Sequence, residues 1–231
     1  MKDIILIGAS GVAHEIIDTI FEINKMKKTW NLLGIIDDDP LKTGNKFYSN
    51  ISILGTSEVI KQYDMEKTWF LIVFCSPQNF LKRKKYAEGL ISKYPGIQFA
   101  NIIHPKAYIA ETAQIKKGIF LGYGVVVDSM AVIQDHVIIL FYSVISRFVE
   151  INNYSFISAS VNITNNKSIG KSTYLGVNAT INANIGNQVL VGAGSVIKKD
   201  IDGPCVVSTE NPSKLVSFKS FDRMQYFLNC I

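Results

Sequence analysis

Two short segments near the start of the chain carry the residues best suited to hold a phosphorylated ligand. Residues 4–7 read as a buried strand, residues 8–11 as a glycine loop after it, and residues 14–26 as a helix. Backbone N–H groups in such a loop, together with the positive end of the helix dipole, favour an anion. Asp37 and Asp38 end the next predicted strand, where an acidic side chain reaches a ribose hydroxyl in nucleotide-binding sheets.

The glycine loop and the aspartates each have a second interpretation. The loop is incomplete as a dinucleotide fingerprint, because Ser10 and Ala13 take the places of the second and last glycines, so it could be a purely structural turn. The aspartates could simply cap the turn at the end of their strand. Since the two features end adjacent strands, together they favour a nucleotide phosphate and ribose. A nucleotide sugar satisfies both without a nicotinamide ring.

The elements that must position these residues alternate between strand and helix. Further strands are predicted at residues 32–36, 51–54, 69–74 and 98–102, with helices through Val59 and Tyr63, capped by Thr56 or Ser57, and from about 78 to 93, opened by Ser76-Pro77. This alternation indicates a small α/β domain with a parallel, Rossmann-like sheet.

The second half of the chain has a different periodicity. From Ile103 to Ile181 every sixth residue is Ile, Leu or Val, and after a slip of two the pattern resumes at Ile185, Val191 and Ile197. A period of six fits neither a helix nor a simple strand, but it fits a triangular solenoid in which each side is one short strand and a turn. We therefore expect an α/β domain over residues 1–101, a β-helix over 102–202 and a C-terminal tail over 203–231.

Composition narrows the classes of partner. Of 231 residues, 48% are hydrophobic and 19% charged, and the net charge is +5. The basic runs at residues 25–28 and 82–85 are expected to be solvated helix faces, so no nucleic-acid partner is predicted. Three cysteines without paired spacing favour a reducing compartment and argue against a zinc site. Without a signal peptide or an apolar stretch of about 18 residues, we expect a cytoplasmic protein with neither metal nor membrane partner.

The segments ILIGASG, GIIDDD and IIHPKA, together with the hexapeptides, resemble one family over nearly the whole chain. It is the family of sugar O- and N-acyltransferases of the sialic-acid O-acetyltransferase and nucleotide-amino-sugar N-acetyltransferase type. The resemblance implies a left-handed β-helix and a homotrimer. It also implies that acetyl-CoA, the co-substrate, lies in the groove between neighbouring helices of that trimer.

The resemblance also implies binding residues. The nucleotide sugar would be held by Gly8, Ser10, Gly11, Asp37 and Asp38. The CoA groove would be lined by Asn178, Gly192, Ala193, Gly194 and Ser195, with Lys214 near the CoA phosphates.

The chain departs from the family pattern in its middle coils. The family's histidine and the acid that follows it correspond here to Arg147 and Phe148. A second histidine position, near the acceptor, is Phe156, and a usually polar position in the preceding coil is Leu140. Four polar positions of the family's pocket are therefore occupied by an arginine or by large apolar side chains.

The missing histidine changes the chemistry that the chain can perform. A sugar hydroxyl near pH 7 needs a general base, whereas a fraction of a sugar amine is already neutral and can attack a thioester directly. Arg147 cannot be that base, because the pKa of a guanidinium stays above about 12, but it could bind a phosphate or a carboxylate. Glu150 of the same hexapeptide is the other candidate base, or else a surface charge paired with Arg147 or a lysine.

Three interpretations remain. The protein N-acylates an amino sugar by positioning alone or with Glu150 as base, it uses a redirected pocket for a different acceptor, or it is a catalytically degenerate relative that binds a nucleotide sugar or a partner. We expect the first, with acetyl transferred from acetyl-CoA to the amino group of a nucleotide-linked sugar in surface-glycan biosynthesis.

Overall fold

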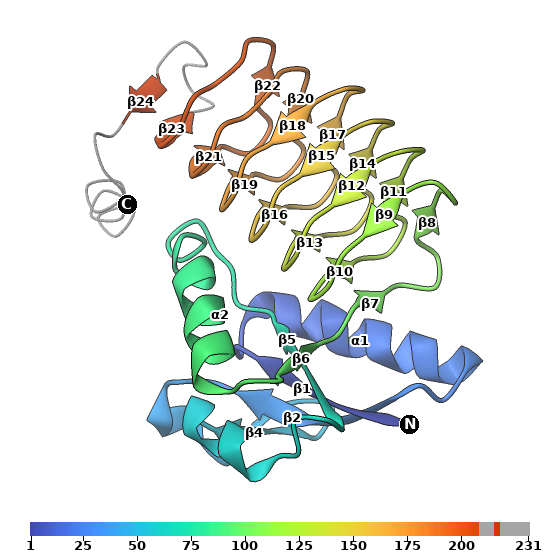
Figure 1. The fold of residues 1–231 in the computed structure, drawn as a ribbon, viewed down its shortest axis with the longest axis vertical. Helices are drawn as coiled ribbons and strands as arrows, with labels where there is room; N and C mark the ends of the chain where they lie inside the picture. Colours follow the sequence, from blue (N-terminus) through green and yellow to red (C-terminus); the bar gives the residue numbers. More distant parts are fainter. Residues whose placement is uncertain (208–214, 218–231) are drawn as a thin grey trace.

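A computed structural model describes residues 1–207 and 215–217 of the chain and shows a small α/β domain joined to a β-helix (Figure 1). The sheet of the α/β domain has the order β3-β4-β2-β1-β5-β6, and β3 pairs antiparallel with β4 while the other pairs are parallel. Its strands are β1 (Lys2–Ile7), β2 (Trp30–Ile36), β3 (Lys46–Tyr48), β4 (Ile51–Gly55), β5 (Thr68–Ile72) and β6 (Gln98–Phe99).

Helices cover both faces of this sheet. Ile4 and Leu6 of β1 pack in one cluster with the apolar face of α1 (Gly11–Met26), whereas Ile5 and Ile7 pack in another with α2 (Lys82–Lys93). Alternate residues of a central strand thus face opposite layers, as the period-2 geometry of a strand requires. The Rossmann-like domain expected from the sequence is confirmed.

Several predicted boundaries are wrong in detail. The helix expected through Val59 and Tyr63 is a short 3-10 helix, η2 (Ser57–Gln62), and α2 begins at Lys82 because residues 77–80 form turns. The strand expected at 98–102 divides into β6 and β7 (Ile102–Ile103), the first strand of the β-helix. Strand β3 and the 3-10 helix η1 (Pro40–Lys42) were not predicted.

The β-helix has three parallel sheets, here called sheets I, II and III. Sheet I contains β7, β10 (Phe120–Leu121), β13 (Ile138–Ile139), β16 (Phe156–Ile157), β19 (Tyr174–Leu175), β21 (Val189–Val191), β23 (Cys205–Val207) and β24 (Leu215–Ser217), the last strand pairing antiparallel. Sheet II contains β8 (Tyr108–Ile109), β11 (Val126–Val127), β14 (Val144–Ile145), β17 (Asn162–Ile163), β20 (Thr180–Ile181) and β22 (Val196–Ile197). Sheet III contains β9 (Gln114–Ile115), β12 (Val132–Ile133), β15 (Glu150–Ile151) and β18 (Ser168–Ile169).

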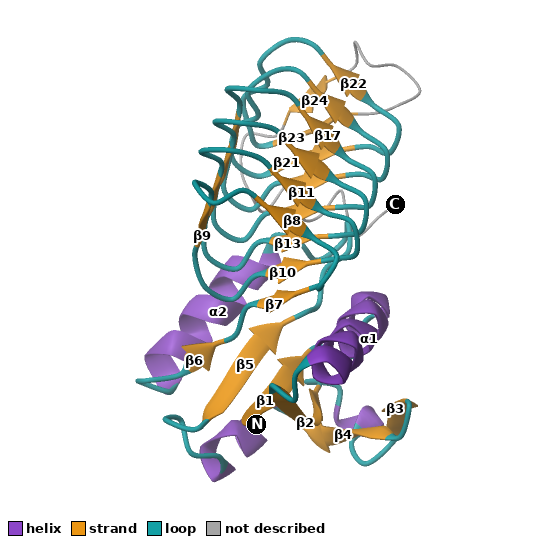
Figure 2. Cartoon of the chain, turned by 90° about the vertical axis from the view of Figure 1, so that its right-hand side faces the viewer, coloured by secondary structure: helices purple, strands orange, loops and turns teal. Residues whose placement is uncertain are grey.

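The register explains the hexapeptide period. Leu121 pairs with Ile139, eighteen residues on, and both side chains are buried in the interior of the coil. Leu175 pairs with Val191, sixteen residues on, which is the slip of two seen in the sequence. Figure 2 shows the coils stacked on one another above the α/β domain. The structure confirms the predicted left-handed β-helix.

The corners of the coil repeat as regularly as its sides. Every sixth residue from Gly118 to Asn178 has φ near +60°. Asn tolerates this left-handed conformation, but it costs about 1–2 kcal/mol for a residue such as Tyr142 or Phe148. We call the corners I–II, II–III and III–I after the sheets that they join.

The α/β domain lies against sheet I. Outward-facing Phe120, Ile138 and Phe156 of that sheet share one apolar cluster with Ile20 of α1 and Phe80. The II–III corner is the corner opposite sheet I, so it points away from the α/β domain of its own chain. In the described part of the chain, no helix is long and apolar enough to cross a membrane.

Candidate functional site

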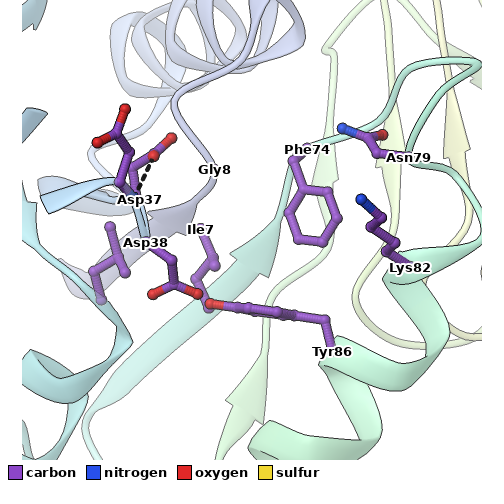
Figure 3. A pocket seen from close by; sticks show the side chains of 10 residues that line it. Ile7, Gly8, Asp37, Asp38, Phe74, Asn79, Lys82 and Tyr86 are labelled. Atoms are coloured by element: carbon purple, nitrogen blue, oxygen red, sulfur yellow. Dashed lines mark hydrogen bonds between the residues drawn. The ribbon is translucent and has the colours of Figure 1, made fainter. Parts of the chain in front are cut away.

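A cavity of about 310 Å³ lies at the carboxyl ends of β1, β2 and β5 (Figure 3). Strand order places β1 at the centre, because the chain proceeds from β1 to β2 and β4 on one side and then crosses to β5 on the other. In open parallel sheets, ligands bind at such a switch point, in the crevice beyond the strand ends. Gly8 and Asp37 line this cavity, as the nucleotide prediction requires.

Gly8 is required for the shape of the loop after β1. Its φ is +114°, and a Cβ there would lie 2.7 Å from Cβ of Phe74 and 2.9 Å from its backbone nitrogen. The loop therefore runs directly against the end of β5, which only glycine permits. Ser10 strengthens the same contact, since its hydroxyl donates to the carbonyl of Val73 at 3.0 Å. Ser10 does not line the cavity, so the structure gives it a role in holding the loop.

Asp37 holds the other side of the loop. Its Oδ2 accepts from the Ala9 N–H at 2.8 Å and its Oδ1 from the Asp39 N–H at 3.0 Å, while Lys42 Nζ lies 3.1 Å from both oxygens. Burial acts to raise the pKa of Asp37, but these hydrogen bonds outweigh it and hold the pKa below its ordinary value. Both carboxylate oxygens are thus engaged, and Asp37 is ionised at neutral pH.

Asp38 also lines the cavity. Its Oδ1 accepts from the Ser57 N–H at 2.7 Å and thereby caps the start of η2. The sequence had predicted this capping role for Thr56 or Ser57. Figure 3 shows the Tyr86 hydroxyl directed at this carboxylate. Burial, and then the charge of Asp38, raise the pKa of Tyr86, so the phenol remains protonated and can donate a hydrogen bond.

Sequence reasoning missed the wall of the cavity that follows β5. Phe74, Asn79, Lys82 and Tyr86 line it, and Lys82 brings a cation to this wall (Figure 3). The signal was present, because residues after the strand at 69–74 had to share an edge with the glycine loop. Gly11, by contrast, lies outside this cavity and borders a second one beside α1.

The predicted CoA residues gather at the I–II corner. Asn178 and the segment Gly192–Ser195 lie in turns of successive coils, and the Gly194 N–H donates to the Val177 carbonyl at 2.8 Å. A Cβ on Gly194 would meet nothing within 4 Å, so the surface over this turn is open. These turns fit an extended ligand running along the corner. Lys214 lies outside the described residues.

The predicted catalytic residues lie elsewhere on the coil. Arg147 is exposed in a turn of the II–III corner, and half-buried Glu150 follows on sheet III. Glu150 Oε1 accepts from Gln134 Nε2 at 2.9 Å, and the ion pairs among the described residues do not join it to Arg147. In one chain, therefore, the cavity at the carboxyl ends of the strands, the I–II turns and Arg147 are three separate places.

Phe156, the second histidine position, is buried against the α/β domain. It is 2% exposed and stacks on Tyr174, with ring centroids 5.1 Å apart. This position supports the domain contact and cannot reach a ligand. Within the described residues no three His, Cys, Asp or Glu side chains cluster as a metal site would require.

Comparison with known proteins relates this geometry to a family. Residues 3–88 match the family described as the PglD N-terminal domain. The acetyltransferase domain of PglB from Neisseria gonorrhoeae FA1090 is 21% identical, with a TM-score of 0.78, over 91% of this chain and 98% of that chain. That domain is also solved in complex with acetyl coenzyme A.

A mutant of perosamine N-acetyltransferase from Caulobacter crescentus, in complex with CoA and GDP-perosamine, is 19% identical with a TM-score of 0.81. The match covers 94% of this chain and 98% of that one. The search of curated proteins finds no match. Residues 3–88 thus match the PglD N-terminal domain family, and the chain shares the fold of these two solved acetyltransferases, as its motifs indicated.

Proposed function

We propose that the protein transfers an acetyl group from acetyl-CoA to an amino group of a nucleotide-linked sugar. One observation carries the proposal: a single chain combines a cavity at the switch point of a parallel sheet with a β-helix corner of open turns. The cavity suits a nucleotide diphosphate, with Lys82 for phosphate and Tyr86 as a hydrogen-bond donor. The solved neighbours with this fold bind acetyl-CoA, or CoA with a nucleotide sugar, which supports the same pair of ligands here.

The residue at position 147 favours an amine over a hydroxyl as the acceptor. A guanidinium cannot remove a proton from a sugar hydroxyl, because its own pKa is above about 12. A primary amine needs only to lose its ammonium proton before it attacks the thioester carbonyl. Exposed Arg147 is suited instead to the phosphates of either substrate.

We further propose that the working unit is a homotrimer in the cytoplasm, acting in surface-glycan biosynthesis. Arg147 lies at the corner opposite its own α/β domain, so it can approach a nucleotide cavity only on a neighbouring copy. Large apolar side chains are exposed at this corner and on the adjoining sheet II, among them Phe148 at 53% and Val196 at 51%. Exposed apolar groups of this size are typical of surfaces that pack against another protein.

The test is turnover of acetyl-CoA with a panel of UDP-linked and GDP-linked amino sugars and their hydroxyl analogues, followed by thiol release. We expect release with at least one amino sugar and with no hydroxyl analogue. Binding of a nucleotide sugar without thiol release from any acceptor would favour the alternative, a degenerate relative that serves as a binding module. Sedimentation equilibrium tests the trimer.

A further inference from the structure

A second cavity, of about 470 Å³, lies between α1 and the I–II corner of the β-helix. Three carboxylates of α1 face it, from Glu15, Asp18 and Glu22. His14 of α1 also lines it, and from the corner His104, Tyr123 and Tyr142 complete the titratable lining. A cavity with more acids than bases suits a cationic ligand, and an amino sugar carries an ammonium group near pH 7.

Glu15 is the carboxylate of this cavity with a buried oxygen that no described residue satisfies. Asp18 Oδ1 accepts from the Tyr48 hydroxyl at 3.0 Å, and Glu22 Oε1 pairs with Lys25 Nζ at 2.6 Å. Glu15 Oε1 is buried and makes no hydrogen bond with the described residues. It reaches so close to the coil that a Cβ added to Gly122 would meet it.

The environment of Glu15 suits a proton acceptor. Burial raises its pKa to about 7, opposed in part by the nearby Phe141 N–H. A general base is most effective when its pKa lies near the working pH. On the coil side of the cavity, the Lys106 ammonium lies 5.5 Å from the Tyr123 ring centroid.

The histidines of the cavity are less suited to the same task. His104 Nδ1 accepts from the Lys106 N–H at 3.0 Å, so a neutral ring carries its proton on Nε2 and has no free acceptor. Burial also lowers the pKa of His104 below its ordinary value. The His14 ring packs on Phe47, with ring centroids 4.4 Å apart. His14 is nevertheless exposed, so it remains in contact with water.

The position of the cavity connects the two proposed substrate sites. Gly11, which borders it, ends the loop that Gly8 begins in the nucleotide cavity. Tyr142 lies at the I–II corner, three coils before the turn Gly192–Ser195. With coils about 4.8 Å apart, these turns are separated by roughly 14 Å, a span that an extended pantetheine arm can follow.

Resting on the proposed function, we propose that Glu15 is the general base of the transfer, in place of the histidine that the β-helix lacks. The acceptor ammonium gives one proton to the Glu15 carboxylate. The nitrogen lone pair then attacks the thioester carbonyl, the C–N bond forms and the C–S bond breaks. The leaving CoA thiolate takes the second nitrogen proton, and Glu15 returns its proton to water. The products are an N-acetyl sugar and CoA.

The experiment compares Glu15→Gln with the matched control Glu66→Gln, an exposed carboxylate remote from both cavities. For the wild type, we expect kcat to rise with pH and level off above about 7. Glu15→Gln should lose about 10²- to 10⁴-fold in kcat and the break near pH 7, while binding UDP or GDP and acetyl-CoA like the wild type. A ¹³C carboxyl titration of the free protein should show one glutamate with a pKa near 7, absent in the variant.

The outcomes separate the two proposals. If the wild type turns over but Glu15→Gln keeps its rate and its pH break, Glu15 is not the base and the proposed function stands. If His14→Gln, and not Glu15→Gln, lost the break near pH 7 in the pH dependence of kcat, His14 would be the general base. If no amino sugar releases thiol, the proposed function fails and the role of Glu15 falls with it. A Glu15 resonance that titrates below pH 5 overturns the inference without any assay of turnover.

Discussion

Arg83 Nη2 donates to the backbone carbonyl of His136 at 3.0 Å, and this bond joins α2 to the III–I corner of the β-helix. Arg83 is 1% exposed, and its other bonds also go to carbonyls, of Tyr154 at 3.3 Å and Ile72 at 3.4 Å. The ion pairs among the described residues include none to its guanidinium. Carbonyl dipoles from both domains therefore balance a buried charge, which fixes the α/β domain on the coil.

We expect Arg83→Met to lower the free energy of unfolding by about 2 kcal/mol, because three buried carbonyls lose their donor. Removal of the buried charge offsets part of that cost. Urea unfolding measures the change, and Lys84→Met, at the adjacent exposed position, is the control. Equal stability of the two variants would show that the guanidinium does not hold the domains together.

His136 should make stability depend on pH in a defined window. Burial, and then the charge of Arg83, lower its pKa from 6.5 to about 4. The unfolded chain therefore binds the proton first, so stability is complete above about pH 6.5, falls as the pH drops towards 4, and levels off below it. The difference of 2.5 between these two values corresponds to about 3 kcal/mol.

Glu15 changes the stability of the fold with pH in the opposite direction over part of this pH window, because its pKa is raised to about 7. Its stabilising contribution is present below its unfolded pKa and is lost as the pH rises through 7. The measurement is therefore the difference between wild type and His136→Gln in urea unfolding from pH 7 to pH 4. We expect the wild type to lose more stability than the variant, and parallel curves would contradict the buried, neutral His136.

Sequence alone predicted the fold well because its signal repeats. From Ile103 to Leu175 each buried aliphatic residue of sheet I stacks on one eighteen residues away, so the hexapeptide period reports directly on the coil. The walls of the cavities were missed because they depend on contacts between distant segments. Lys82 and Arg83 belong to one basic run expected to be solvated, yet Lys82 lines the nucleotide cavity and Arg83 is buried. No local pattern distinguishes two adjacent cations that a helix turns to different surroundings.

The packing of the His136 ring can be tested through a glycine of the coil below it. Gly118 has φ +69°, and a Cβ there would lie 2.6 Å from His136 Nδ1. The ring cannot easily move, since it stacks on Tyr154 with centroids 5.2 Å apart and meets Phe99 at 4.5 Å. Gly118→Ala should therefore lower the free energy of unfolding by about 1–2 kcal/mol through left-handed strain, and by about 1–3 kcal/mol more through overpacking.

Gly194→Ala is the matched control, because it has the same φ of +69° but nothing within 4 Å of the added Cβ. Gly194→Ala should lower the free energy of unfolding by the left-handed strain alone, about 1–2 kcal/mol. The difference between the two variants in urea unfolding isolates the contact with His136. If both alanines cost the same, the ring yields and the packing at this corner is loose.

The nucleotide cavity can be tested through its cation. Lys82 lines the cavity beside Phe74 and Asn79 (Figure 3). Lys84, by contrast, pairs with Glu88 at 3.9 Å on the exposed side of α2. Lys82→Met should weaken binding of UDP or GDP about tenfold, which corresponds to about 1.4 kcal/mol. Lys84→Met should not weaken it. Because the contact is between charges, the deficit of Lys82→Met should shrink as salt is added.

Isothermal titration calorimetry at two salt concentrations measures both variants. Lys42 provides the contrast, since its ammonium pairs with Asp37 beside the cavity and does not line it. If Lys42→Met lost affinity for the nucleotide while Lys82→Met kept it, the diphosphate would have to lie on the β2 side of the crevice. The switch point between β1 and β5 would then position the loop but not the phosphates.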